Sequence, residues 1–206
     1  MKNILYESND MVKIGCNECE DCCECCCGMG QSIVLDPYDI YMLEKNLCGS
    51  FETLMQDKIE LQVVDGLILP NLKMQGSSER CGFLNEEGRC SIHTFRPGLC
   101  RLFPLGRNYD EGEMKYFLLE NVCPKQNQAK IKIKKWLDMP ELKQYEKFLV
   151  SWHYFRKKVQ EEIAQMQSAD RVKAVNMRIL QLFYLTPYTD GDFYGQFAKR
   201  MEEWME

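Results

Sequence analysis

The sequence predicts an α+β fold in which a cysteine-rich N-terminal half with short strands and hairpins packs on a helical C-terminal half. Two observations support this class. All 12 cysteines lie at or before Cys123, and seven of them fall between Cys16 and Cys27. From about Asn127 onward, apolar residues recur at the three- and four-residue spacing of a buried helix face. We therefore divide the 206 residues into a cysteine-cluster region at 1–126 and a helical region at 127–206, packed as one unit.

The first helix is expected to begin at Pro37. Asp36 before a proline fits an N-cap followed by the first helical position. The apolar run Ser32–Leu35 before it predicts a short buried strand. The inner face of this helix would carry Ile40, Leu43 and Leu47. Ser50 is the expected cap of a second helix that runs through residues 54–59.

Two β-hairpins are expected after these helices. The turn pair Asp65-Gly66 stands between two apolar runs and is a strong local hairpin signal. A second hairpin would join Cys81–Leu84 to Arg89–Ile92 through an Asn-Glu-Glu-Gly turn. It would bring its two cysteines close together, as metal-binding knuckles do.

Proline positions and the spacing of apolar residues predict the remaining helices and strands. Residues 94–103 are expected to form a short helix or turn that Pro104 stops, and residues 115–119 another strand. The expected helices of the second half are 127–138, 140–166, 168–185 and a shorter one from Asp192.

Composition argues against several functions. The formal net charge is −5, with 31 acidic and 26 basic residues, which disfavours a nucleic-acid-binding surface. No apolar stretch is long enough to span a bilayer, and the first residues have no signal-peptide core, so we expect a cytoplasmic protein without membrane contact. We interpret the one basic stretch as the solvated face of a helix that half-buries Ile131, Ile133 and Trp136. It consists of Lys130, Lys132, Lys134 and Lys135.

The cysteine run predicts a metal site. Cytoplasmic thiols stay reduced, so dense cysteines indicate metal binding before disulfides, and cysteines this close pair only through strained loops. The run holds two overlapping registers of Cys-x2-Cys-x2-Cys-Cys, namely Cys16, Cys19, Cys22 and Cys23, or Cys19, Cys22, Cys25 and Cys26. Adjacent cysteines in an extended chain point in opposite directions, so Cys25 and Cys26 would serve two neighbouring centres more easily than one.

A second group of cysteines completes the candidate ligand set. It comprises Cys81, Cys90, Cys100 and Cys123. The pair Cys123-Pro124 is similar to the end of a bacterial ferredoxin run, whose last cysteine often serves a different cluster. Thiolates concentrate negative charge, and Arg96 and Arg101 are placed to offset it. Arg107 is assigned instead to the surface or to a pairing with carboxylates.

Several residues have two interpretations. His93, three residues after Cys90, is a zinc ligand, a Rieske-like ligand, a proton donor or simply a half-buried polar residue. Cys23 and Cys27 are either ligands or extra thiols beside a complete set. Cys48 is expected to pack at a helix end. There is no P-loop, Gly-x-Ser-x-Gly or His-Glu-x-x-His motif, so the sequence leaves open whether the protein is an enzyme.

These motifs resemble the YkgJ-type cysteine cluster family, the zinc- or iron-chelating CxxCxxCC domain shared by flagellin lysine N-methylases. The resemblance rests on Cys19-x2-Cys22-x2-Cys25-Cys26, on Ser32-Ile-Val-Leu-Asp-Pro-Tyr-Asp, and on Cys90-Ser-Ile-His-Thr-Phe-Arg-Pro-Gly-Leu-Cys-Arg-Leu-Phe-Pro. It implies that Arg96 and Arg101 support a set of metal ligands. That set is Cys19, Cys22, Cys25, Cys26, Cys81, Cys90 and Cys100, which spacing extends by Cys16 and Cys123.

We expect one or two iron–sulfur clusters of the 4Fe–4S type, with a redox or electron-transfer role and an unidentified protein partner. Nine thiolate candidates with only two histidines in the chain suit cubane clusters better than one tetrahedral zinc. The first alternative is a zinc-binding structural or interaction module with two four-cysteine sites. The second is a protein-lysine N-methylase, although the sequence has no nucleotide-binding fingerprint.

Overall fold

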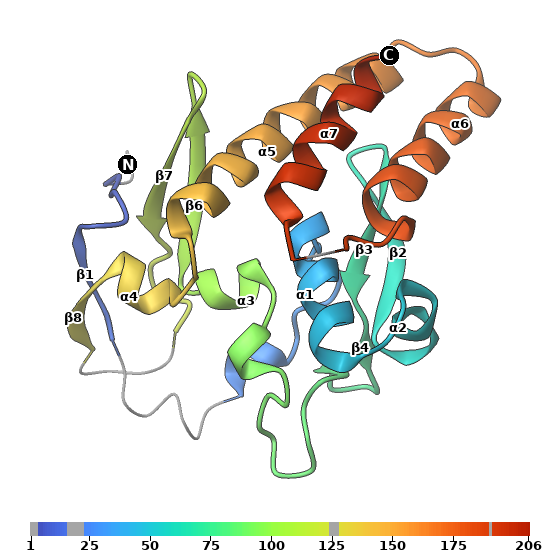
Figure 1. Cartoon of the computed structure of the whole chain (residues 1–206). Helices are drawn as coiled ribbons and strands as arrows, with labels where there is room; N and C mark the ends of the chain where they lie inside the picture. Colours follow the sequence, from blue (N-terminus) through green and yellow to red (C-terminus); the bar gives the residue numbers. More distant parts are fainter. Residues whose placement is uncertain (1–3, 16–22, 124–127, 190) are drawn as a thin grey trace.

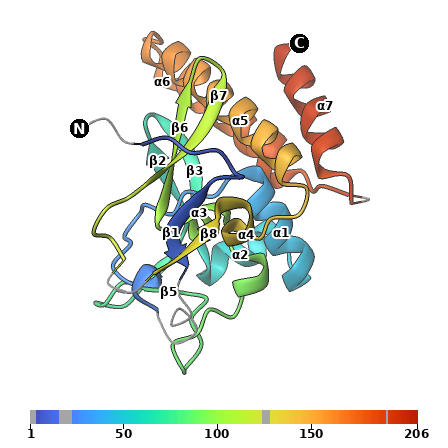
Figure 2. The ribbon, with the colours of Figure 1, turned by 90° about the vertical axis from the view of Figure 1, so that its left-hand side faces the viewer.

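The computed structural model describes residues 4–15, 23–123, 128–189 and 191–206. Long helices lie at one end of the molecule, and the loops that carry cysteines lie at the other, as both views show (Figures 1 and 2). The helical end consists of α5 (Leu142–Ala164), α6 (Ala169–Leu180), a π-helical turn η4 (Gln181–Leu185) and α7 (Phe193–Met205). This mixture of helices with short antiparallel hairpins confirms the predicted α+β class.

Helix α1 (Pro37–Leu47) begins where the sequence predicts. Its N-terminus is a capping box: Asp36 Oδ1 accepts the Asp39 N–H at 2.9 Å, and Asp39 Oδ2 accepts the Asp36 N–H at 3.0 Å. Ile40 and Leu43 are buried as expected. The prediction for Leu47 is wrong, because this residue is the last of the helix and is 40% exposed.

Helix α2 (Phe51–Asp57) follows, and Ser50 caps it as predicted by accepting the Thr53 N–H at 3.4 Å. It ends earlier than predicted because Ile59 already belongs to a strand. The predicted hairpin is confirmed as β2 (Ile59–Val64) and β3 (Leu67–Leu72). Its turn has positive φ angles at Asp65 and Gly66, 50° and 84°, which match a hairpin turn of the I′ kind.

The predicted strand at Ser32–Leu35 is wrong. Its backbone meets β3 at both ends, since Leu72 donates to the Ile33 carbonyl at 3.0 Å and Leu35 donates to the Pro70 carbonyl at 2.8 Å. Only Val34 forms a bridge, opposite Asn71. Pro70 has no N–H to return a bond, so the ladder cannot continue.

A second set of strands lies on the other side of the molecule (Figure 1). The hairpin β6 (Leu105–Asp110) and β7 (Glu113–Leu118) contains the strand predicted at 115–119. β1 (Met11–Gly15) pairs with β8 (Ala129–Lys132), which leads into α4 (Ile133–Leu137).

The helix predicted at 127–138 is therefore wrong in its first part. Residues 129–132 form a strand, and only Ile133–Leu137 is helical. Lys130 and Lys132 are exposed while Ile131 between them is half-buried, which is the period-two alternation of a strand. The interpretation of this basic stretch as one amphipathic helix holds only from Ile133 onward.

The cysteine-bearing segment contains only short elements. These are η2 (Glu24–Cys26), β4 (Met74–Gln75), β5 (Arg80–Cys81), η3 (His93–Phe95) and α3 (Gly98–Leu102). The second predicted hairpin is not a ladder: Leu84 and Cys90 form one isolated bridge, and Cys81 pairs instead with Met74. The predicted short helix within 94–103 is confirmed, and it ends before Pro104.

Two hydrophobic clusters hold the elements together. The larger one is built of aromatic rings under α5, α6 and α7, and it extends to Cys81, Phe83 and Ile92. The smaller one packs β1 and β8 against β6 and β7. Leu99, next to Cys100, packs against both clusters. The segment of Cys100 is thus anchored where the two clusters meet.

None of the helices in the described ranges combines the length and the hydropathy needed to span a bilayer.

Candidate metal centre

Six cysteines line one cavity of about 150 Å³. They are Cys25, Cys26, Cys81, Cys90, Cys100 and Cys123. Apolar side chains such as Leu72, Ile92 and Trp136 form much of the remaining wall. All six cysteines belong to the predicted ligand set and come from five separate segments of the chain. The other predicted ligands, Cys16, Cys19 and Cys22, lie outside the described residues.

The adjacent thiols of Cys25 and Cys26 both reach this cavity, contrary to the expectation for an extended chain. The chain is not extended here, because η2 is a 3-10 turn in which the Cys26 N–H donates to the Cys23 carbonyl at 2.8 Å. The Cys26 thiol donates a hydrogen bond to the sulfur of Cys25, which lowers the pKa of Cys25 to about 7. Two neighbouring cysteines can therefore serve one centre.

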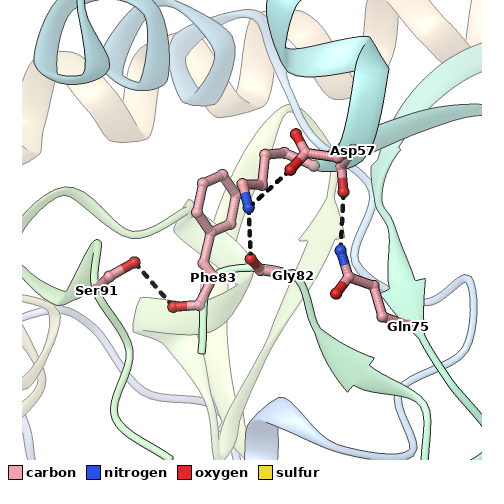
Figure 3. Close-up of polar contacts among 6 residues, drawn as sticks. Asp57, Gln75, Gly82, Phe83 and Ser91 are labelled. Atoms are coloured by element: carbon pink, nitrogen blue, oxygen red, sulfur yellow. Dashed lines mark hydrogen bonds and ion pairs between the residues drawn. The ribbon is translucent and has the colours of Figure 1, made fainter. Parts of the chain in front are cut away.

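The segments of Cys81 and Cys90 are tied together through the residues that follow them. The Phe83 carbonyl accepts two bonds from Ser91, one from the backbone N–H and one from Oγ, each 2.9 Å long (Figure 3). The Gly82 carbonyl accepts from Lys58 Nζ at 2.9 Å, which fixes this segment to the end of α2. These bonds replace the missing ladder of the predicted hairpin and place the two cysteines on facing chains.

Cys100 is positioned by contacts to Gly98, at the start of α3. The Gly98 N–H donates to Asp39 Oδ1 at 2.7 Å, and its carbonyl lies 3.4 Å from Arg107 Nη2. A Cβ atom on Gly98 would overlap the hydroxyl oxygen of Tyr145. Only glycine permits this approach, which explains the glycine in the Arg-Pro-Gly-Leu-Cys block.

Asp39 is the supporting residue that the sequence analysis missed. Its carboxyl is buried and joins the N-terminus of α1 to α3, which connects two of the three segments of the family resemblance. Burial raises the pKa of Asp39 well above its usual value, and the charge of Asp36 raises it further, while the Gly98 N–H and Arg107 oppose this effect. The sequence does contain a signal for this residue. Asp39 stands three residues after the N-cap Asp36, which is the spacing of a capping box.

The three arginines have different surroundings. Arg96 lines the cavity, and its Nη1 contacts His93 Nε2 in the same wall. Arg101 is 5% exposed and donates to backbone carbonyls, including those of Arg96 and Asp138, both at 3.1 Å. It thus braces the backbone around α3. Arg107 lies near Asp36 and Asp39, and its charge lowers the pKa of each. Its Nη2 contacts the Gly98 carbonyl and the Tyr145 hydroxyl, so the expected pairing with carboxylates stays a prediction.

Of the remaining cysteines and histidines that the structure describes, His93 alone lines the cavity. His93 lines the cavity in contact with Arg96, so both a ligand role and a polar wall role remain compatible with its position. Among the described cysteines, Cys23 and Cys27 are not part of the cavity wall. Cys48 lies at the end of α1 as expected, but it is exposed there, so the prediction that it packs is wrong. His153 lies outside the cavity wall and stacks on Tyr109 with ring centroids 3.8 Å apart.

The sulfurs of the cavity influence one another. Burial is the main cause that raises the pKa of Cys81, Cys90 and Cys100, and charge on neighbouring cysteines adds to it. A metal ion among these thiols would favour their thiolate forms and displace the protons. Within the described ranges, no three His, Cys, Asp or Glu side chains converge closely enough to hold one ion. The thiols therefore surround a space rather than a point.

This space fits a group of several atoms. A cavity of about 150 Å³ has room for a molecule the size of benzene. The donors are soft thiols, and the wall supplies two arginines, Arg89 and Arg96, to balance their charge. The chemistry and the size of the cavity both suit a cysteine-bound metal cluster.

A family model described as "CxxCxxCC: Putative zinc- or iron-chelating domain" matches residues 15–124, slightly more than half of the chain. The matched segment contains all the cavity cysteines. No curated protein and no solved structure matches the chain.

Proposed function

Since the chain belongs to this CxxCxxCC family of zinc- or iron-chelating domains, we propose that its cysteine-lined cavity holds an iron–sulfur cluster with a redox or electron-transfer role. The observation that carries the proposal is the arrangement of six thiols around an apolar space of about 150 Å³. A zinc ion bound by four cysteines needs its sulfurs about 2.3 Å from one point. A cubane of iron and sulfide fills a volume and binds its cysteines at the corners.

Three of the cluster ligands are Cys81, Cys90 and Cys100, which approach from separate segments. The fourth comes from Cys25, Cys26 or Cys123, which line the same cavity. Bound there, the cluster supplies a one-electron donor and acceptor. The chain's own contribution is to exclude water with its apolar wall and to hold positive charge beside the sulfurs through Arg96, both of which tune the potential of such a centre.

A redox partner would approach the cavity at η2. Cys25 is exposed there, and the His93–Arg96 pair lies in the same wall. Electrons exchanged at this side would not have to cross the aromatic core under the helices.

The test is metal and acid-labile sulfide analysis of the full chain purified without oxygen. We expect iron and sulfide in equal amounts and a brown protein with broad visible absorption. Cys90→Ser and Cys100→Ser should lose most of both, whereas the matched control Cys48→Ser, which removes a thiol outside the cavity, should keep them. Zinc without sulfide in the unmodified protein would overturn the proposal in favour of a zinc-stabilised module.

Lysine methylation, the third class considered from sequence, stays a prediction because none of the observations above bears on it. Transfer of an isotopically labelled methyl group from S-adenosylmethionine to candidate proteins would test it.

A further inference from the structure

A group of exposed lysines gathers on β1, β8 and α4. In the two paired strands, alternation buries Val12 and Ile14 and leaves the lysines of each strand exposed. β8 runs directly into α4, whose first turn adds two more exposed lysines. We call this group the basic patch, and it consists of Lys13, Lys130, Lys132, Lys134 and Lys135. Its elements lie on the left of Figure 1, the side that Figure 2 turns toward the viewer.

The patch concentrates positive charge that the described residues do not neutralise. Lys13 and Lys130 are directly opposite each other in the ladder, and like charges in this arrangement disfavour strand pairing. The ion pairs between described side chains lie elsewhere, at the end of α2 and within β7. Asp10, directly before β1, uses its Oδ2 locally to accept the Glu7 N–H at 2.8 Å. The patch therefore attracts anionic groups of another molecule, although the whole chain carries a net charge of −5.

The inner side of the same elements forms part of the cavity wall. Ile14, next to Lys13 on β1, is 1% exposed and lines the cavity. Trp136, next to Lys135 on α4, also lines the cavity, and its Nε1–H donates to the Phe103 carbonyl at 3.0 Å. A single layer of backbone thus separates the patch from the cavity. A molecule bound on the patch would be close to the cavity without crossing the aromatic core.

The side chains of this surface fit a protein partner. Met11, opposite Lys132 in the ladder, is 54% exposed, so an apolar side chain stands among the lysines. Methionine is enriched in protein–protein interfaces, whose apolar centre is surrounded by a polar rim. A surface for single-stranded nucleic acid would instead offer aromatic rings on which bases stack, and the patch contains none.

We propose that the basic patch docks an acidic redox protein, on the premise that the cavity holds the proposed cluster. The lysines attract the acidic face of the partner and raise the rate of encounter, and Met11 supplies an apolar contact. One electron passes between the partner and the cluster, so one is oxidised as the other is reduced, with no bond made or broken. Cys25 lines the same small cavity, so the docked protein also lies near the exposed end at η2.

The first experiment measures electron transfer to the full chain purified without oxygen. The probe is a reduced plant-type [2Fe–2S] ferredoxin with an acidic surface, mixed with the chain by stopped flow at low and at high ionic strength. The triple variant Lys13→Gln, Lys130→Gln, Lys132→Gln should lower the second-order rate constant about tenfold or more at low ionic strength. The difference should shrink at high ionic strength, because salt screens the charges.

A matched control removes the same amount of charge from the helical part. It replaces three exposed lysines of α5 and α6 by Gln, namely Lys157, Lys158 and Lys173. Because these lysines lie outside the patch, the rate constant should stay within about twofold of that of the unmodified chain. An equal loss of rate in both triple variants would show that net charge alone steers the probe, and would overturn the proposal.

A second measurement locates the docked probe without relying on electron transfer. A carbodiimide couples carboxylates of the ferredoxin to nearby lysines, and fragment mass spectra identify the lysines that have reacted. We expect cross-links at Lys13, Lys130 and Lys132 in excess over those at Lys157 and Lys158. Cross-links spread evenly over the exposed lysines would overturn the proposal. Duplex DNA that binds the patch more tightly than the ferredoxin does would overturn it in favour of a nucleic acid.

The docking surface and the cluster fail in different ways. Equal rates of reduction in the unmodified chain and the patch variant would contradict the docking surface and leave the cluster in place. Cross-links at the patch in a chain that contains zinc and accepts no electrons would contradict the cluster, while the docking surface for an acidic protein would stand.

Discussion

The aromatic core and the cysteine cavity are built in different ways. Under the helices, Phe183 is fully buried, and its ring centroid lies 5.1 Å from those of both Trp152 and Phe155. Around the cavity, the backbone forms short turns and isolated bridges, and several thiols remain half-exposed. The helical part can be stabilised by hydrophobic burial alone, whereas the cavity has too little regular structure for that.

We infer from this difference that core packing stabilises the helical part, whereas the cysteine segments need a further contribution, which the proposed metal centre would supply. Asp39 and Tyr145 connect the two parts, since both are buried in the helical core and both touch Gly98 of the cysteine segment. A change in one part should therefore leave the other part largely intact.

Metal removal should have the largest effect. Structural cysteine-bound metals contribute on the order of 10 kcal/mol to folding of the segments that hold them. After chelation under reducing conditions, amides of residues 81–103 should lose protection from hydrogen exchange, while those of α5 should keep it. Equal loss of protection in both would show that the two parts are not separately stabilised.

Phe183→Ala should perturb the other part. Truncating a fully buried aromatic ring costs about 3–5 kcal/mol in the free energy of unfolding. Urea denaturation followed by circular dichroism measures this loss, and Leu61→Ala, at a side chain already 37% exposed, is the control. Metal content per folded chain should be unchanged, and a loss of metal comparable to that of Cys90→Ser would contradict the separation.

Gly98→Ala should affect the connection between the two parts. The added methyl group would collide with the hydroxyl of Tyr145, and overpacking of this kind costs about 1–3 kcal/mol. Because α3 has to move, metal content should fall while the helical circular dichroism signal is kept. Gly49→Ala, where a Cβ meets its nearest neighbour at 3.7 Å, should bind metal normally.

Asp39→Asn should change the pH dependence of stability. Burial raises the pKa of Asp39 in the folded state above its value of about 4 in the unfolded chain. The protonated carboxyl therefore stabilises the fold at low pH, and this contribution is lost as the pH rises from about 4 through the raised pKa. The free energy of unfolding of the metal-bound protein should therefore fall less between pH 4 and 8 in Asp39→Asn than in the unmodified chain. Parallel profiles would show that Asp39 does not titrate differently in the folded state.

Local signals predicted much of the fold. The caps at Asp36 and Ser50 and the turn at Asp65-Gly66 act within a few residues, so the sequence alone located α1, α2 and the β2–β3 hairpin. The sequence wrongly predicts a helix over Ala129–Lys132, because these four residues run directly into α4 and their partner strand β1 lies more than 100 residues away.

The candidate site was predictable in composition but not in arrangement. Thiol chemistry and spacing selected all six cysteines that line the cavity. Cys25 and Cys26 line the cavity, whereas Cys23 and Cys27 do not. This difference depends on the 3-10 geometry of η2, which the sequence does not reveal. The support of α3 by Asp39 joins residues 59 positions apart, and only the packed fold brings them together.

The most direct test of the central claim is a crystal structure of the anaerobically purified protein, with anomalous diffraction measured at the iron and zinc edges. We expect iron inside the cavity, bonded to the sulfurs of Cys81, Cys90 and Cys100. Zinc at that position, or iron bound away from these three sulfurs, would contradict it.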